Sequence, residues 1–291
     1  MKYVKQGFFP GALTATVRGC LILVSALSFS APSRAITVTQ NDNALSLASA
    51  VTAGTSGLIV TSASLSGQTD GIGALSTGTY ANPSNTYGIG PGIVLSTGNV
   101  SNYADGPNTS DSTATDYDSS ATTAQEALLD PITGGTFNHF DVTQLDLTFD
   151  SSTGKVFFLG VFGTEEYPEL IGSPSIDAFG LYLNGVNIAQ SGGIPINVNH
   201  PAMAALAGTE LDGVLAPGNN PVLLFSGPAN PTGNTLSFII ADTSDGIFDA
   251  TVYISSLSDV NPVPVPAAVW LFGSGLLGLI GVARRKAGRN A

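Results

Sequence analysis

The feature that most constrains the fold of this chain is the spacing of its apolar residues along the sequence. They occur in short runs separated by segments rich in Gly, Ser, Thr and Asn; Val142–Phe149, Thr235–Ala241 and Ala250–Ser256 are examples. Successive side chains of a strand point to opposite faces, so a run that alternates apolar with polar residues predicts a half-buried strand. Because no helical pattern separates most of these runs, the sequence predicts an all-β domain, either an antiparallel β-sandwich or a jelly roll.

Two segments predict particular places in such a sheet. Phe179–Ala189 alternates on both sides of Asn184-Gly185, the dipeptide that supplies the two positive φ angles of a type I′ turn, and therefore predicts a hairpin. Lys155–Phe162 is apolar on both faces, which is typical of a central strand.

Helices are expected to be few and short. Ala44–Val51 predicts one helix, with Asp42 or Asn43 as its N-cap. A second short helix is expected around Met203. The polar and acidic stretch Ser101–Thr123 is expected to be a long loop, and loops of that length are usually functional or mobile.

The first 35 residues have the features of a secretory signal peptide. Basic residues precede the apolar run Cys20–Phe29, and Ser33-Arg34-Ala35 is a small-x-small cleavage site. Export predicts that residues 1–35 are removed and that residues 36–260 fold outside the cytoplasm as one domain.

The C-terminal residues 261–291 form a second targeting segment. The apolar run Ala267–Ala283 spans roughly 25 Å as a helix, the short end of what a bilayer core needs. A proline-containing collar precedes this predicted transmembrane helix and a basic cluster follows it, which predicts that the end of the chain stays on the cytoplasmic side of the inner membrane. The collar and the cluster consist of Val263, Pro264, Pro266, Arg284, Arg285 and Lys286.

This arrangement resembles the PEP-CTERM sorting signal of Gram-negative bacteria. The resemblance implies export, transient anchoring in the inner membrane, and processing by an exosortase-type enzyme that releases the protein to the cell surface or extracellular matrix. It also implies an association with extracellular polysaccharide. The Pro-Glu-Pro that names the signal is here Pro264-Val265-Pro266, so the cleavage position stays open.

The charge of the predicted domain is strongly one-sided. All 21 acidic residues of the chain lie in it, against a single Lys or Arg residue, Lys155, which gives a formal charge of −20. Such a surface repels nucleic acid and suits either a divalent cation or simple solubility. The domain contains no cysteine, so it forms no disulfide. With only His139 and His200 as nitrogen ligands, zinc is not the metal that the composition favours.

Two acidic clusters are the candidate metal ligands. Oxygen-rich groups of this kind favour Ca²⁺, which takes six to eight oxygen ligands, and closely spaced carboxylates repel one another unless they are protonated or metal-bound. The alternative is a solvated turn whose aspartates cap their own backbone. The predicted ligands are Asp242, Asp245 and Asp249, joined by Glu165, Glu166 and Asp177.

Several motifs resemble the choice-of-anchor L domain over residues 43–258. The resemblance implies an anchored, β-rich surface protein and supplies no catalytic residues to transfer. The motifs are Gly92–Gly98, Gly106–Asn108, Glu165–Glu169, Asp177–Gly180, Ala241–Asp245 and Asp249–Val252.

An enzyme is the alternative class. A glycosidase needs two carboxylates about 5 to 9 Å apart across a cleft, and Glu165 or Glu166 could be paired with Asp177 or Asp249. The chain lacks a Gly-x-Ser-x-Gly motif and has two histidines, so a nucleophilic triad is not expected. The sequence favours a non-enzymatic module with a structural or adhesive role, stabilised by Ca²⁺.

Overall fold

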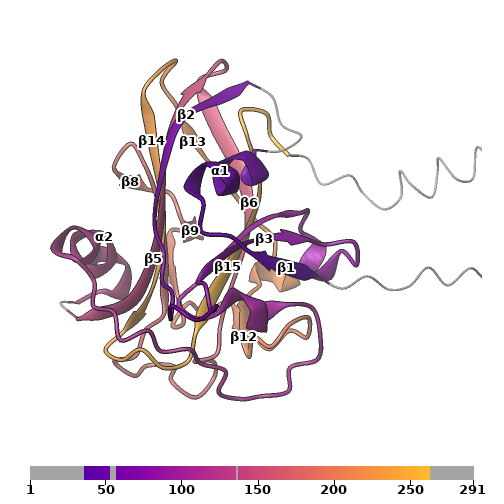
Figure 1. Ribbon diagram of the computed structural model, residues 1–291, viewed down its shortest axis with the longest axis vertical. Helices are drawn as coiled ribbons and strands as arrows, with labels where there is room; N and C mark the ends of the chain where they lie inside the picture. The colour runs from indigo at the N-terminus through magenta and orange to yellow at the C-terminus, as the bar shows by residue number, and fades with distance from the viewer. Residues whose placement is uncertain (1–35, 53–56, 136, 263–291) are drawn as a thin grey trace, which may run out of the picture. The chain divides into compact units, whose positions relative to one another are not determined.

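The computed structural model describes residues 36–52, 57–135 and 137–262. The predicted signal peptide and the predicted sorting residues from Val263 to Lys286 lie outside these ranges. Among the described residues, no helix has the length and apolar character needed to cross a bilayer. Most of the described chain is β-structure in two antiparallel sheets, as the sequence predicted (Figure 1).

The first sheet is built around β6, which pairs with β15 on one side and with β12 and β13 on the other, as expected of a central strand. Its strands in spatial order are β1 (Thr37–Gln40), β3 (Thr77–Ala81), β4 (Gly92–Ser96), β15 (Ala250–Ser258), β6 (Lys155–Thr164), β12 (Gly213–Leu215) and β11 (Met203–Ala204), with β13 (Leu223–Pro228) beside β6.

The second sheet is built around β14, which pairs with β5 and β7. Its strands in spatial order are β2 (Leu58–Ser66), β5 (His139–Ser151), β14 (Asn234–Thr243), β7 (Ala178–Leu183), β10 (Ile194–Asn197) and β9 (Gln190–Ser191), with β8 (Val186–Asn187) beside β7. The hairpin β7–β8 confirms the predicted turn, since Asn184 and Gly185 have φ of 50° and 82°.

The main hydrophobic core lies between the two sheets and draws on both. Phe158 of β6 stacks on Phe225 at a centroid distance of 5.0 Å and meets Phe238 of β14 edge-on at 5.8 Å. Each such ring contributes roughly 1.5–3 kcal/mol by burial. These contacts across the two layers support the predicted sandwich.

Helix α1 (Ala44–Val51) confirms the first predicted helix. The Asn43 side chain caps it by accepting a hydrogen bond from the Ser46 amide at 2.9 Å. Leu47 and Val51 bury its inner face in the main core.

Helix α2 (Thr123–Thr133) was not predicted. A capping box begins it, in which the Thr122 and Gln125 side chains each accept a hydrogen bond from the other's backbone N–H. Leu129 and Ile132 pack on the outer face of the second sheet, where α2 lies beside β5 in Figure 1. The remaining helical turns are short 3₁₀ segments at Thr86–Gly88, Val100–Tyr103 and Pro217–Asn219.

The helix expected around Met203 is wrong, because Met203 lies in β11 and pairs with Leu215 of β12. Pro201 and Gly208 leave too few residues between them to nucleate a helix. Pairing with β12 therefore prevails over the helix propensity of the Ala and Leu residues in this stretch.

Candidate functional site

Carboxylates gather at one end of the sandwich, where β6 and β14 finish and β5, β7 and β15 begin. The pairing register brings these termini together, since Thr164 pairs with Ala250 and Ala178 with Ala241. Six acidic side chains lie at or next to these termini, and each is at most 2 % exposed: Asp141, Glu165, Glu166, Asp177, Asp242 and Asp249. We call this region the acidic end.

Asp249 is fully hydrogen-bonded. One of its carboxylate oxygens accepts from the Thr115 amide at 2.9 Å, and the other accepts from the Tyr103 hydroxyl at 3.0 Å. Burial raises the pKa of Asp249 to about 6, although these two hydrogen bonds oppose the change. The carboxylate packs against Gly98, where any side chain would collide with it.

Asp141 has a similar role on β5. Its carboxylate accepts hydrogen bonds from the amides of Tyr117 and Ser119 at 2.9 and 3.0 Å. Burial raises the pKa of Asp141 to about 6 against the effect of these hydrogen bonds. Asp141 and Asp249 thus attach the long loop that precedes α2 to the sandwich.

Glu166, Asp177 and Asp242 form the inner acidic triad. The Asp177 amide donates to a Glu166 carboxylate oxygen at 2.9 Å, and the Thr164 hydroxyl donates to one Asp177 oxygen. The other oxygens of Glu166 and Asp177, together with both oxygens of Asp242, are buried without a hydrogen-bond partner among the described residues. Thr97 lies near Asp242 and opposes its pKa shift, but does not reach hydrogen-bond geometry.

Among the described residues, no lysine or arginine pairs with the triad to offset its charge. Burial raises the pKa of Asp242 and of Asp177 well above the ordinary range, and the neighbouring carboxylates raise both further. Burial likewise raises the pKa of Glu166 to about 7. Lys155 begins β6 and lies roughly 30 Å from the end of that strand, too far to pair with the triad.

Glu165 belongs to a different set of neighbours. Burial first, and then the negative charge of Asp212, raise the pKa of Glu165 to about 9. Both Glu165 oxygens and one Asp212 oxygen are buried without a hydrogen-bond partner among the described residues. Asn108 donates to the other Asp212 oxygen. The adjacent residues Glu165 and Glu166 therefore serve two separate groups of carboxylates.

Asp245 is not part of the inner acidic triad, although its negative charge also raises the pKa of Glu166. Its carboxylate accepts from the Ser175 hydroxyl at 2.8 Å and from the Ile247 amide at 3.2 Å, and the residue is partly exposed. This is the arrangement of an Asx turn, the alternative considered for the predicted cluster. The structure thus distributes the six predicted ligands among the triad, Glu165, Asp249 and this turn.

The oxygen donors of the inner acidic triad fit a hard cation in kind. Four buried oxygens without partners come from three carboxylates, and Ca²⁺ binds oxygen ligands at 2.3–2.6 Å. The three carboxylates do not all lie within 4.8 Å of one another, so binding would draw the strand ends together. Without metal, the same oxygens need protons or ordered water to satisfy them.

Two surface pockets lie at the opposite end of the sandwich. One, of about 350 Å³, is lined by Leu183, Asn184 and Asn230 among others. The other, of about 340 Å³, is lined by Lys155 and Phe157 with the end of β13. Neither is lined by a carboxylate, so the acidic side chains considered for a glycosidase do not face these pockets.

A second group of titratable side chains was missed by the sequence analysis. Glu126, Asp130 and His139 bring their ligand atoms within 4.8 Å of one another, and among the described residues no other group of three or more such side chains does so. The missed signal was the capping box Thr122-x-x-Gln125, which announces α2 and places Glu126 and Asp130 one turn apart.

Comparison with known proteins gives one family. The sequence model of the choice-of-anchor L domain matches residues 36–210, more than half of the chain. A search of curated proteins found no match. The matched range contains α1, α2 and the segment Glu165–Glu169, while the two motifs at Ala241–Asp245 and Asp249–Val252 follow it. The chain therefore belongs to the choice-of-anchor L family, and by that membership it is a cell-surface or exported protein.

Proposed function

We propose that this protein is a structural or adhesive module of the cell surface or extracellular matrix whose sandwich is stabilised by Ca²⁺ at the inner acidic triad. The observation that carries the proposal is the set of buried carboxylate oxygens that have no partner among the described residues. Buried charges without partners destabilise a fold unless they are neutralised, and this domain offers no nearby lysine or arginine to do so.

Calcium suits the exported location of the protein. Extracellular modules bind Ca²⁺ with Kd of about 10⁻⁴ to 10⁻³ M. Glu166 follows β6 of the first sheet, while Asp177 directly precedes β7 and Asp242 lies in β14, both strands of the second sheet. An ion held by all three would join the two layers where their charges otherwise push them apart.

The proposed route to the surface follows from the two ends of the sequence. After export, an exosortase-type enzyme would process the tail around Pro264–Pro266 and release the module from the inner membrane of a Gram-negative cell. Extracellular polysaccharide is the proposed matrix partner. Both suggestions come from the resemblance of residues 261–291 to the sorting signal, not from a contact within the domain.

The burial of the acidic side chains favours a structural role for them over a catalytic one. Glu165 is 2 % exposed and Glu166, Asp177 and Asp249 are each 0 % exposed, whereas glycoside hydrolysis needs carboxylates that reach a sugar. Assays against a polysaccharide panel are expected to show no release of reducing sugar. Turnover that disappears in a correctly folded Glu165→Gln variant would establish the enzyme instead.

The proposal is tested on intact cells that express wild-type, Asp242→Asn or Asp245→Asn protein. Antibody labelling should detect the module outside the cell, and removing it should reduce cell–matrix cohesion. An EDTA wash should make the wild type and the Asp245→Asn control sensitive to added protease, and Ca²⁺ should restore resistance to both. For Asp242→Asn, protease sensitivity should be the same with EDTA and with Ca²⁺. Protein found only in the cytoplasm, or protease sensitivity that never depends on Ca²⁺, would overturn the proposal.

A further inference from the structure

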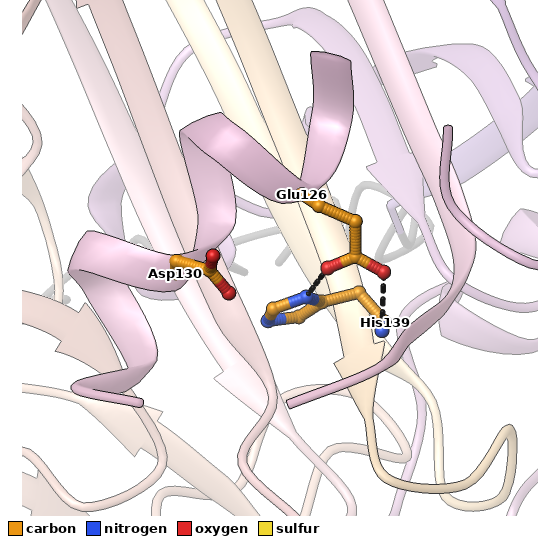
Figure 2. Close-up of side chains that lie close together, drawn as sticks. All are labelled: Glu126, Asp130 and His139. Atoms are coloured by element: carbon orange, nitrogen blue, oxygen red, sulfur yellow. Dashed lines mark hydrogen bonds and ion pairs between the residues drawn. The ribbon is translucent and has the colours of Figure 1, made fainter. Parts of the chain in front are cut away.

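We propose that Glu126, Asp130 and His139 form a second metal site, separate from the acidic end and selective for a divalent transition metal such as Zn²⁺. Figure 2 shows the three side chains between α2 and the start of β5. The inference does not depend on the calcium proposal, because it concerns a different group of residues.

Helix geometry places the two carboxylates. Glu126 and Asp130 are four residues apart, so they lie one above the other on the same face of α2, and both point toward the His139 imidazole in Figure 2. Their ligand atoms and that of His139 all lie within 4.8 Å of one another. Side chains on a helix and on the first residue of a strand thus converge on one point.

His139 is held firmly enough to act as a ligand. It is 0 % exposed, and its backbone carbonyl accepts a hydrogen bond from the Ala121 amide at 2.9 Å. One Glu126 oxygen accepts from the His139 amide at 3.1 Å, and the other lies 2.5 Å from Nδ1 of the ring. The nitrogen that faces Glu126 is therefore Nδ1.

The other ring nitrogen has a partner suited to the metal-bound form. Thr133 Oγ1 lies 3.4 Å from His139 Nε2 and 3.4 Å from the Leu129 carbonyl oxygen. When the hydroxyl donates to that carbonyl, its lone pairs face Nε2 and favour a proton there. Without metal, Nδ1 donates its proton to Glu126 Oε2, 2.5 Å away, and a bound metal would displace that proton and take the electron pair of Nδ1. Partners of this kind fix the tautomer and orientation of metal-binding histidines.

The third ligand, Asp130, has a carboxylate oxygen that accepts no hydrogen bond from a described residue. Asp130 Oδ1 is buried and has no hydrogen-bond partner among the described residues. Among the described residues, no lysine or arginine forms an ion pair with Asp130. A cation placed among the three side chains would satisfy this oxygen and balance the two carboxylates.

The donor set selects the kind of metal. One imidazole and two carboxylates provide three protein ligands, the number found in zinc sites that keep a fourth position for water. Imidazole nitrogen suits Zn²⁺ and its neighbours in the first transition row, whereas Ca²⁺ takes oxygen ligands. The composition argued against zinc because histidines are few, but a site of this kind needs only one when two carboxylates join it.

The test is Zn²⁺ titration of the full chain, without an affinity tag, in excess Ca²⁺ so that the acidic end is saturated. Calorimetry should give one saturable site for Zn²⁺. Asp130→Asn and Glu126→Gln should weaken binding about tenfold or more, and Thr133→Val about 10- to 100-fold. Asp242→Asn and the exposed control Asp42→Asn should leave the Zn²⁺ affinity unchanged.

Histidine NMR provides a readout that a purely structural role would not move. The chain has two histidines, so Zn²⁺ should shift the ring signals of His139 and leave those of His200 in place. Absence of saturable binding at millimolar Zn²⁺ would overturn the proposal, as would shifts confined to His200. Equal affinity in the wild type, Asp130→Asn and Glu126→Gln would do the same. Loss of zinc binding in Asp242→Asn, with Asp130→Asn unaffected, would assign the ion to the acidic end.

Discussion

Replacing Asp242 with asparagine should change stability in opposite directions in the absence and presence of Ca²⁺. Asp242 is 1 % exposed, both of its carboxylate oxygens lack partners among the described residues, and burial raises its pKa well above the ordinary range. In EDTA at mildly alkaline pH, the buried Asp242 carboxyl group must either carry a negative charge in the interior or keep a proton that it would lose in water. Both cost free energy, and Asp242→Asn removes that cost. The variant should therefore melt above the wild type.

The calcium response sets the size of the opposite effect. A ligand that binds only the folded state stabilises it by RT ln(1 + [L]/Kd), about 2.7 kcal/mol when Ca²⁺ is at a hundredfold excess over Kd. With a Kd of about 10⁻⁴ M, that excess is reached at about 10 mM Ca²⁺. For a domain of about 225 residues, this corresponds to a rise in Tm of about 5–10 °C in the wild type. Asp242→Asn should lose most of that rise.

The assay is thermal unfolding by circular dichroism in EDTA and across a Ca²⁺ series. Asp245→Asn is the matched control, because Asp245 lies three residues along the chain with its carboxylate already bonded to Ser175 and Ile247. Its Ca²⁺ response should equal that of the wild type. If the wild-type Tm does not move with Ca²⁺, the buried carboxylates are not a calcium site. If Asp242→Asn melts lower in EDTA and keeps the full Ca²⁺ response, the argument from unpaired buried charge fails.

Three further predictions follow from the same structure. In EDTA the Tm should fall as pH rises from about 5 to about 9, because folding raises the pKa of Glu166 to about 7 and that of Glu165 to about 9. The stability that these protonated groups give is present below their unfolded pKa near 4.5 and is lost as pH passes through the folded values. Ca²⁺ should flatten this profile, and a Tm that rises with pH in EDTA would contradict the prediction. Gly98→Ala should destabilise the domain by about 1–3 kcal/mol in denaturant unfolding, since the added methyl group collides with a buried carboxylate, and an unchanged midpoint would show that the site relaxes. Intact-mass measurement of surface-extracted protein should give a chain that begins near Ile36 and lacks the residues beyond about Pro266; a mature form that still ends at Ala291 would make the tail a permanent anchor.

Local sequence signals were sufficient for most of the strands and for α1. The hairpin at Asn184-Gly185 and the two-faced strand Lys155–Thr164 depend on turn chemistry and on residue alternation, which any short window contains. Helix α2 was missed because its apolar stripe is narrow and follows a long polar loop. The helix predicted around Met203 was wrong because pairing with the partner strand β12 decided the conformation of this stretch.

The acidic site shows the same division. The sequence identified Glu166, Asp177 and Asp242 as ligand candidates, but placed them in one set with Asp245. Spacing along the chain cannot say which carboxylate of a turn points between the sheets and which points out. The β-bulge between Ile240 and Asp242 at the end of β14 is one such local feature that no spacing rule reveals.

By itself, the sequence determined the fold class and the charged residues of the domain: an all-β chain with 21 acidic residues, one lysine in its domain, and no cysteine there. With one lysine and no arginine against 21 acidic residues, nearly every buried carboxylate of the domain must lack a lysine or arginine partner, wherever the fold puts it. Only the tertiary structure decided which carboxylates are buried, because that depends on which strand ends meet. A carboxylate on the surface is solvated by water, whereas a buried carboxylate without a partner is not. The same convergence, between a helix and a strand that the sequence analysis did not connect, brought Glu126 and Asp130 to His139.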